Sequence, residues 1–217
     1  MGGTPNQQQN IDSLRQEIAP AVENLKEIFP EVRRFMEDPR TETVVTAGGG
    51  PNYAEFMGMG QEDRSPHPSK NVIEVRTKAR NADWPVEITV LGEHLHGRGS
   101  LDMDGNPQDP KFFRLKEEFI ANMTPQQMSW LEQDYNEALS RGATGSSMDS
   151  IDNFLRHSWA DGEIRGHLIP DLMEREEDRI NMTNQVYLSD KQKDIINEMS
   201  RYVFQQPKKE DDWQWGS

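Results

Sequence analysis

The sequence of 217 residues contains no cysteine. This excludes disulfide bonds, thiolate zinc sites and cysteine nucleophiles, and it is typical of a reducing compartment. No apolar run approaches the roughly 18 residues of a membrane-spanning helix, and no signal peptide opens the chain. We therefore expect a protein of the cytoplasm or of a virion, neither secreted nor held in a membrane.

Apolar residues are scarce, since they make up 33% of the chain and the mean hydropathy is −0.91. This composition predicts a modest core with segments that depend on a partner. The chain has 38 acidic against 24 basic side chains, for a formal net charge of −14. Such a charge repels nucleic-acid phosphates and anionic membranes at long range, which favours protein partners.

The most regular pattern present is an apolar heptad repeat that begins at residue 11. Its a and d positions are Ile11, Leu14, Ile18, Ala21, Leu25, Ile28, Val32 and Phe35. A stripe of this width is typical of a helix that packs against a partner surface. Pro20 and Pro30 interrupt the repeat, and an interior proline costs about 3 kcal/mol. We therefore expect short amphipathic helices over residues 11–46, each starting with proline. They pack on their own domain or a close subunit partner, the alternatives being an oligomerisation arm or a docking segment.

Three segments look irregular. Residues 1–10 are expected to form a disordered leader, and residues 47–70, rich in glycine and proline, a flexible linker. Residues 205–217 form a polar tail in which Trp213 and Trp215 follow three carboxylates. Exposed tryptophans without a partner lower solubility, so we interpret this tail as a docking motif. Packing back onto the body and a remnant of expression are the alternatives.

Alternation of apolar and polar residues predicts an antiparallel β-hairpin or meander over residues 71–109. Ile73 and Val75 alternate with Glu74 and Arg76, and a second run follows with Val86, Ile88 and Val90. Residues 110–204 show helical periodicity, with apolar stripes that include Met128, Leu131, Tyr135 and Leu139, and then Met148, Ile151, Leu155 and Trp159. The predicted fold is a predominantly helical α+β protein with N-terminal amphipathic helices, a small sheet and a C-terminal helical bundle.

A basic stripe lies on the first predicted strand, where Arg76, Lys78 and Arg80 share one face. With Trp84 nearby, it is a candidate for holding a phosphate backbone or a single strand of nucleic acid. The alternative is the solvated outer face of a one-sided sheet.

Two constellations carry residue types that can do chemistry. On a strand, His94 and His96 would point to one face, which makes them a candidate divalent-metal site for hydrolysis. Asp102 and Asp104 lie close by and could supply carboxylates, with His67 or Glu93 as further ligands. An unliganded surface pair is the alternative, and no other cofactor is expected. The run from His157 to His167 is polar enough to form a site, and helix capping with charge pairing is the alternative reading.

One motif occurs twice. The runs at 123–131 and 188–196 both place a hydroxyl residue three positions before a glutamine, as at a capped helix start, which leaves duplication and convergence open. The second run reads Leu188-Ser189-Asp190-Lys191-Gln192. Residues 188–203 resemble the small C-terminal helical module of some bacteriophage DNA-metabolism proteins. The resemblance implies a phage or mobile-element origin and no particular activity.

Together these observations predict a non-enzymatic protein that works through protein contacts, as a structural, assembly or adaptor component of a phage or virion. Self-association or membership of a larger assembly follows from the heptad stripe. The alternatives are an accessory protein that binds nucleic acid through the basic stripe, and a metal-dependent hydrolase at His94 and His96.

Overall fold

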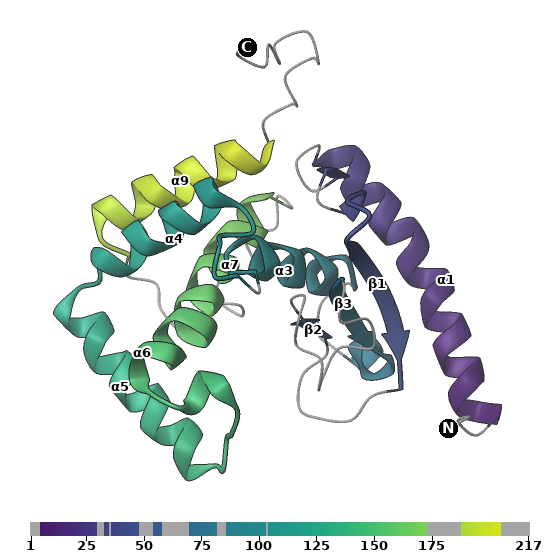
Figure 1. Ribbon diagram of the computed structural model, residues 1–217, viewed down its shortest axis with the longest axis horizontal. Coiled ribbons are helices and arrows are strands. Elements are labelled where there is room, and N and C mark those ends of the chain that lie inside the picture. The colour runs from purple at the N-terminus through teal and green to yellow at the C-terminus, as the bar shows by residue number, and fades with distance from the viewer. Residues whose placement is uncertain are drawn as a thin grey trace, which may run out of the picture.

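The computed structural model describes residues 5–29, 33–34, 36–47, 54–57, 70–81, 86–102, 104–172 and 188–204. The fold is a predominantly helical α+β arrangement, which confirms the predicted class (Figure 1). Its elements are α1 (Pro5–Ile28), β1 (Thr41–Thr46), β2 (Ala54–Met57), β3 (Asn71–Arg76), α3 (Val86–Arg98), α4 (Pro110–Ala121), α5 (Pro125–Ser140), α6 (Ile151–Phe154), α7 (Ala160–Leu172) and α9 (Asp190–Phe204), with 3₁₀ turns at Thr77–Asn81 and Ser146–Met148.

A mixed three-stranded sheet has the strand order β1-β3-β2. β1 runs parallel to β3, with Thr43 opposite Ile73, and β2 runs antiparallel to it, with Phe56 opposite the same residue. The prediction of an antiparallel hairpin over 71–109 is therefore wrong. The partners of β3 come from 41–46, which we expected to be helical, and from 54–57, inside the expected flexible linker.

The segment expected to form the second strand, with Val86, Ile88 and Val90, is helix α3. Ile88, Leu91 and Leu95 follow the helical spacing, but Val90 between them is also fully buried. A helix that is buried on most sides shows no clean period, because apolar residues also occupy the positions that would otherwise be polar. This extra burial produced the alternation that resembled a strand.

Helix α1 is continuous from Pro5 to Ile28 and contains Pro20. Two expectations are therefore wrong: residues 5–10 are helical instead of a disordered leader, and Pro20 does not start a new helix. Pro20 is exposed, while Ile18 and Ala21 on the opposite side are buried in the core. Packing on both sides of the proline stabilises the helix enough to offset the missing backbone hydrogen bond.

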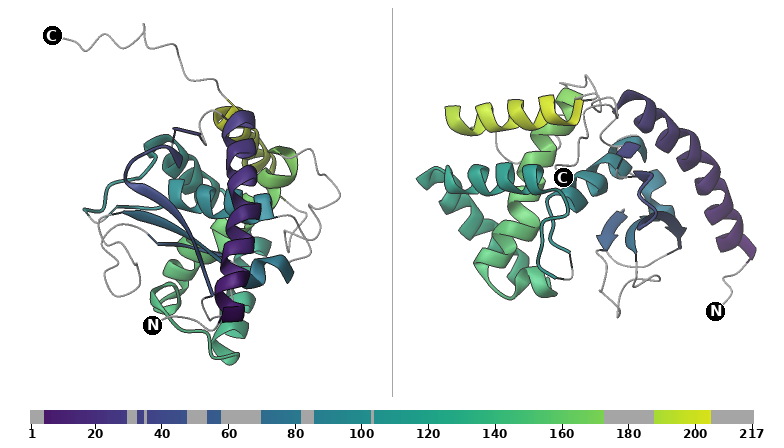
Figure 2. Two further views of the ribbon diagram at one scale, coloured as in Figure 1. Left: turned by 90° about the vertical axis from the view of Figure 1, so that its right-hand side faces the viewer. Right: turned by 45° about the horizontal axis from the view of Figure 1, so that its top comes forward.

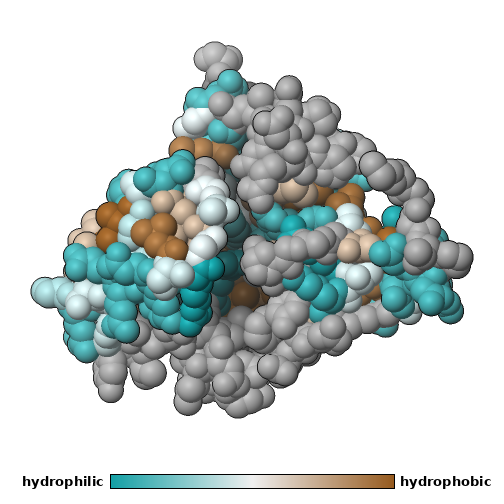
Figure 3. All heavy atoms as spheres, turned by 90° about the horizontal axis from the view of Figure 1, so that it is seen from below, coloured by the Kyte–Doolittle hydropathy of each residue, from teal (hydrophilic) through white to brown (hydrophobic). Residues whose placement is uncertain are grey.

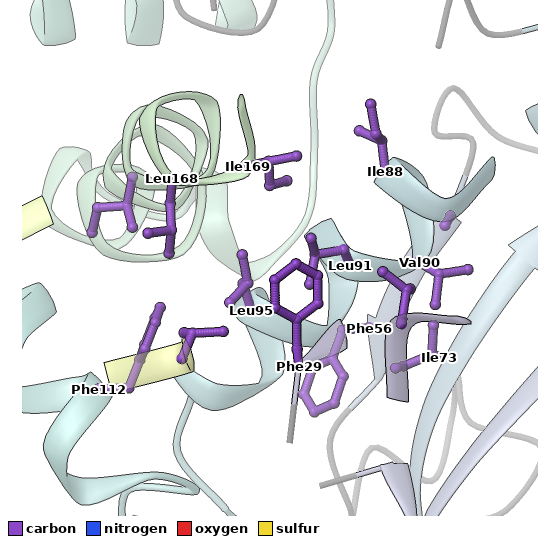
Figure 4. Close-up of a cluster of buried hydrophobic side chains, with 14 of the residues drawn as sticks. Phe29, Phe56, Ile73, Ile88, Val90, Leu91, Leu95, Phe112, Leu168 and Ile169 are labelled. Carbon is purple, nitrogen blue, oxygen red and sulfur yellow. The ribbon is translucent and has the colours of Figure 1, made fainter. Parts of the chain in front are cut away.

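The main core lies between α1, the sheet and α3, and it continues past α3 to α7, α4 and α9. α1 contacts both α3 and β1, and Figure 2 shows it running along the sheet. Phe29, Phe56 and Leu91 meet near the centre of this core, with Leu168 and Ile169 of α7 beyond α3 (Figure 4). α3 is thus the central element, with the sheet on one side and the helical part on the other.

α5 and α6 form a separate lobe at the lower left of Figure 1. Its small core is a second cluster, made by Leu131, Phe154, Leu155, Trp159 and Ala160. A π-helical segment, Leu155–Trp159, joins α6 to α7 without a break. In the part of the chain that the structure describes, no helix is both long and apolar enough to cross a membrane.

Candidate functional site

A cluster of charged side chains lies where α3 faces α7. We call Glu93, His96, Lys116, Asp161 and Arg165 the α3–α7 cluster. His96 stands between two carboxylates, with Nδ1 3.5 Å from Glu93 Oε2 and Nε2 3.5 Å from Asp161 Oδ2. One turn along both helices, Arg165 Nη1 lies 3.2 Å from Glu93 Oε1. The two helices therefore run antiparallel with these contacts in register.

The basic members neutralise the acidic ones. Lys116 of α4 is buried and places Nζ 2.7 Å from Asp161 Oδ1, while also donating to the carbonyl of Gly99. Gly99 lies close to this lysine, since a Cβ atom there would be 3.3 Å from Lys116 Cδ. The cluster thus binds α3, α4 and α7 together through paired charges.

Glu93 also connects the cluster to the sheet, since its Oε2 accepts a hydrogen bond from the backbone N–H of Phe56 at 2.9 Å. Burial raises the pKa of Glu93, but the hydrogen bond with His96 and the charge of Arg165 more than reverse this, so its pKa falls to about 2. Glu93 is therefore a fixed anion at neutral pH.

His157, at the π-helical segment, lies on the margin of the cluster. Burial and the charge of Lys116 lower its pKa, while Asp161 acts in the opposite direction. π-helical turns often occur at functional sites because they re-aim side chains. Within the run 157–167, Asp161 and Arg165 pair with Lys116 and Glu93, which is the charge pairing that the sequence offered as the alternative to a site.

The predicted histidine pair does not converge. Because 86–98 is helical, His94 and His96 point to different sides of α3. His94 is completely buried, and burial with the nearby charge of Arg98 holds its pKa well below the usual value, so it is neutral. Within the described ranges, no three His, Asp or Glu side chains are grouped so that they could hold a metal ion. His94 and His96 therefore do not share one face, as the strand interpretation expected, and a divalent metal on this chain stays a prediction.

The basic stripe is not an open basic surface. Arg76 is buried, and its guanidinium pairs with Glu55 at 2.7 Å and Glu74 at 2.9 Å. Lys78 is half-buried, and the side chain of Arg80 and Trp84 lie outside the described residues. Arg76 cannot hold a phosphate backbone without giving up these carboxylates.

Most of the heptad stripe lies inside the molecule. Leu14, Ile18, Ala21 and Leu25 are buried in the main core and Ile11 packs against it. They are thus core residues and not an exposed docking surface. The side chain of Ile28, together with Val32, Phe35, Trp213 and Trp215, lies outside the described residues.

Exposed apolar residues gather instead on the α5–α6 lobe. Of the four large apolar side chains exposed in the described part of the chain, three belong to this lobe: Met128 at 40%, Leu139 at 44% and Ile151 at 37%. Figure 3, a view from below, shows brown apolar atoms among teal ones on its left side, where the lobe lies. We call Met128, Leu139 and Ile151 the lobe patch.

Sequence reasoning placed these three residues on the inner faces of their helices. The apolar stripes of α5 and α6 are wider than the surface available to cover them, since Leu131 of α5 and Phe154 of α6 are buried in the small core while Tyr135 and Ala138 lie at its margin. An apolar stripe that is wider than the surface it can pack against is the signal in the sequence that could have indicated these exposed residues.

No family model matches this chain, and no curated protein and no solved structure does either.

Proposed function

We propose that this protein is a non-enzymatic interaction component that docks a partner on the α5–α6 lobe. The observation that carries the proposal is the concentration of exposed apolar side chains on one lobe with a thin core of its own. Apolar side chains that stay exposed together on one part of a soluble protein are candidates for an interaction site, because exposed apolar surface costs solubility without a partner. The heptad stripe is not available for this role, since its described members are mostly buried.

The charge around the lobe patch defines the chemistry of the partner. Residues 128–156 contain five acidic side chains, Glu132, Asp134, Glu137, Asp149 and Asp152, and two basic ones, Arg141 and Arg156, which gives a net charge of −3. A partner segment with apolar residues flanked by lysine or arginine complements this surface. A second copy of the chain also carries a net charge of −14. Because the two copies repel each other, self-association through the lobe is disfavoured.

The α3–α7 cluster supports a structural role for the polar residues. Lys116 and Arg165 already engage Asp161 and Glu93 at 2.7 and 3.2 Å, and these contacts hold three helices together.

A phage or virion assembly is the setting we propose for the protein, on the resemblance of residues 188–203. Within such an assembly the lobe acts as an adaptor surface.

Peptide binding tests the proposal. The probe is a synthetic amphipathic helical peptide with leucine on one face and lysine on the other. The first control is a peptide of equal charge in which serine replaces leucine, and the second is a peptide in which glutamate replaces lysine. We expect the lysine–leucine peptide alone to bind, and Leu139→Glu to weaken it at least about tenfold. Because this substitution adds negative charge, attraction by charge alone predicts tighter binding instead.

Gln16→Glu is the matched control, since it adds the same charge at an exposed position of α1. Unchanged or tighter peptide binding by Leu139→Glu overturns the proposal. Light scattering tests whether a second copy of the chain occupies the lobe patch instead. If the mass of the wild-type protein rises with concentration and the mass of Leu139→Glu does not, the lobe patch binds a second copy and the proposal of a basic partner is overturned.

A further inference from the structure

Helix α5 carries its two exposed apolar side chains on one side. Met128 and Leu139 are eleven residues apart in an unbroken α-helix, so they lie within about 20° of each other around its axis. Half-buried Tyr135 and exposed Glu132 lie between them on the same side. We call Met128, Glu132, Tyr135 and Leu139 the α5 stripe. At 1.5 Å per residue it is about 16 Å long, which is three helical turns.

Tyr135 connects this stripe to the third member of the lobe patch. Its ring centroid lies 5.5 Å from that of Phe154 in α6, and its hydroxyl donates to the carbonyl of Met148 at 3.0 Å. Ile151 precedes Phe154 by three positions, so it lies on the face of α6 that turns toward α5. The exposed apolar residues of the two helices therefore border one seam, and Figure 1 shows α5 at the margin of the molecule.

One carboxylate in the α5 stripe is left for a partner. Three of the five carboxylates of the lobe already have partners, namely Asp134 with Trp159, Glu137 with Arg141 and Asp152 with Arg156. The side chains of Glu132 and Asp149 form no ion pair or hydrogen bond with the described residues. Glu132 stands between the two exposed apolar residues of α5, so a cation that neutralises it sits within the same contact.

The stripe belongs to a helix, and this decides the conformation of what binds it. The backbone groups in the middle of α5 are paired inside the helix, so the stripe offers side chains alone. An extended segment laid along it would cover its own backbone N–H and C=O groups without giving them partners. A helix pairs these groups internally and presents one apolar face.

We infer that the partner segment is an amphipathic helix that lies along the α5 stripe. Its apolar residues cover Met128 and Leu139, and one lysine or arginine pairs with Glu132. The inference rests on the proposed docking function, and it adds the binding mode and the residue that fixes the position of the partner. Glu132 is thus the specificity-determining residue of this surface.

Charge reversal at two positions of α5 tests the inference, with binding of the lysine–leucine peptide to the full chain measured by calorimetry. Glu132→Lys is the test variant. Glu137→Lys is the matched control, because it changes the net charge equally and lies nine positions after Met128, on the opposite side of the helix. We expect Glu132→Lys to weaken binding at least about threefold more than Glu137→Lys does. Equal weakening overturns the inference.

A set of altered peptides tests the pairing and the helical mode. In each peptide, one lysine beside the leucine face is replaced by glutamate. One of them should bind Glu132→Lys at least about threefold more tightly than Glu137→Lys, and no such peptide overturns the pairing. A peptide of the same composition with leucine at every second position has the spacing of a strand. It should bind wild type at least about tenfold more weakly, and equal affinity overturns the helical mode.

Leu139→Glu separates this inference from the proposed function. If Leu139→Glu weakens peptide binding while Glu132→Lys and Glu137→Lys act alike, docking on the lobe stands and the inferred helix along α5 is overturned. If Leu139→Glu leaves binding unchanged, or no peptide binds, the proposed function and the inference are both overturned.

Discussion

The side-chain amide of Gln127 donates a hydrogen bond to Oε1 of Gln192 at 3.0 Å, and both glutamines are fully buried. Each glutamine also closes the capping box of its own helix: Gln127 with Thr124 on α5, and Gln192 with Ser189 on α9. The two motifs that echo each other in the sequence are therefore in direct contact. The contact joins the start of the α5–α6 lobe to the C-terminal helix.

Replacing either glutamine should destabilise the protein, because each change leaves buried backbone and amide groups without their partners. For Gln127→Ala or Gln192→Ala we expect a loss of about 1–3 kcal/mol in the free energy of unfolding. The double variant should lose less than the two single losses together, since the shared bond is removed only once. Urea denaturation measures all three, and Gln126→Ala on the exposed side of α5 should change stability by less than about 0.5 kcal/mol. Strict additivity contradicts the coupling.

The sequence was sufficient for the parts of the fold that local chemistry determines. The capped starts of α5 and α9, the burial of Leu14, Ile18 and Leu25, and the predominantly helical class all follow from side-chain type and spacing. These features depend on contacts between residues close together in the chain, or on one apolar face.

The sheet and the site depended on distant contacts. β3 pairs with residues some 30 positions earlier in parallel, and no local pattern indicates such a partner. The α3–α7 cluster joins Glu93 to Arg165 and Lys116 to Asp161 across the chain. Glu93 and His96 are placed on the correct element only if residues 86–98 are predicted to be a helix. The sequence pattern did not indicate this helix, because α3 is buried on most sides and lacks a clear helical period.

Glu93→Gln should change how stability depends on pH. The folded pKa of Glu93, about 2, lies below its ordinary value of 4.5, so the folded state binds fewer protons between these pH values than the unfolded state. The contribution of Glu93 is therefore complete above pH 4.5 and is lost as the pH falls toward 2, with a size on the order of 3 kcal/mol. Thermal unfolding should show wild type more stable at pH 7 and the two curves converging below pH 4.5. A gap of constant size from pH 7 to 2.5 contradicts this role.

Arg98→Met should be among the most destabilising substitutions in α3. Arg98 is almost completely buried and pairs with Asp109 at 2.6 Å, which also caps α4 and accepts a hydrogen bond from the Tyr202 hydroxyl. Removing Arg98 leaves a carboxylate that is only 12% exposed without its cation, and we expect a loss of about 3–5 kcal/mol. Arg98→Lys should recover only part of it, because a lysine lacks the planar fork that reaches Asp109. Arg141→Met, which breaks an exposed pair with Glu137, is the control and should cost less than about 1 kcal/mol.

Gly97→Ala should disturb the packing of α3 on the sheet. A Cβ atom at this position would lie 2.6 Å from Cε2 of the Phe56 ring, so β2 or the ring has to move. We expect a loss of about 1–3 kcal/mol, partly recovered by Phe56→Leu in the same chain. Gly162→Ala in α7 is the matched helical control, since nothing lies within 4 Å of its Cβ position, and it should leave stability unchanged or raise it by up to about 1 kcal/mol. Equal effects of the two changes contradict the close contact.

Mapping the lysine–leucine peptide on the wild-type protein tests the docking claim most directly. Methionine methyl NMR offers probes in the right places, with Met128 and Met148 on the lobe, Met199 of α9 fully buried in the main core, and Met36 packed against that core. The account predicts that the peptide shifts the methyl signals of Met128 and Met148 and leaves those of Met36 and Met199 in place. Shifts of Met36 without Met128, or shifts spread equally over all methionines, contradict a docking surface on the α5–α6 lobe.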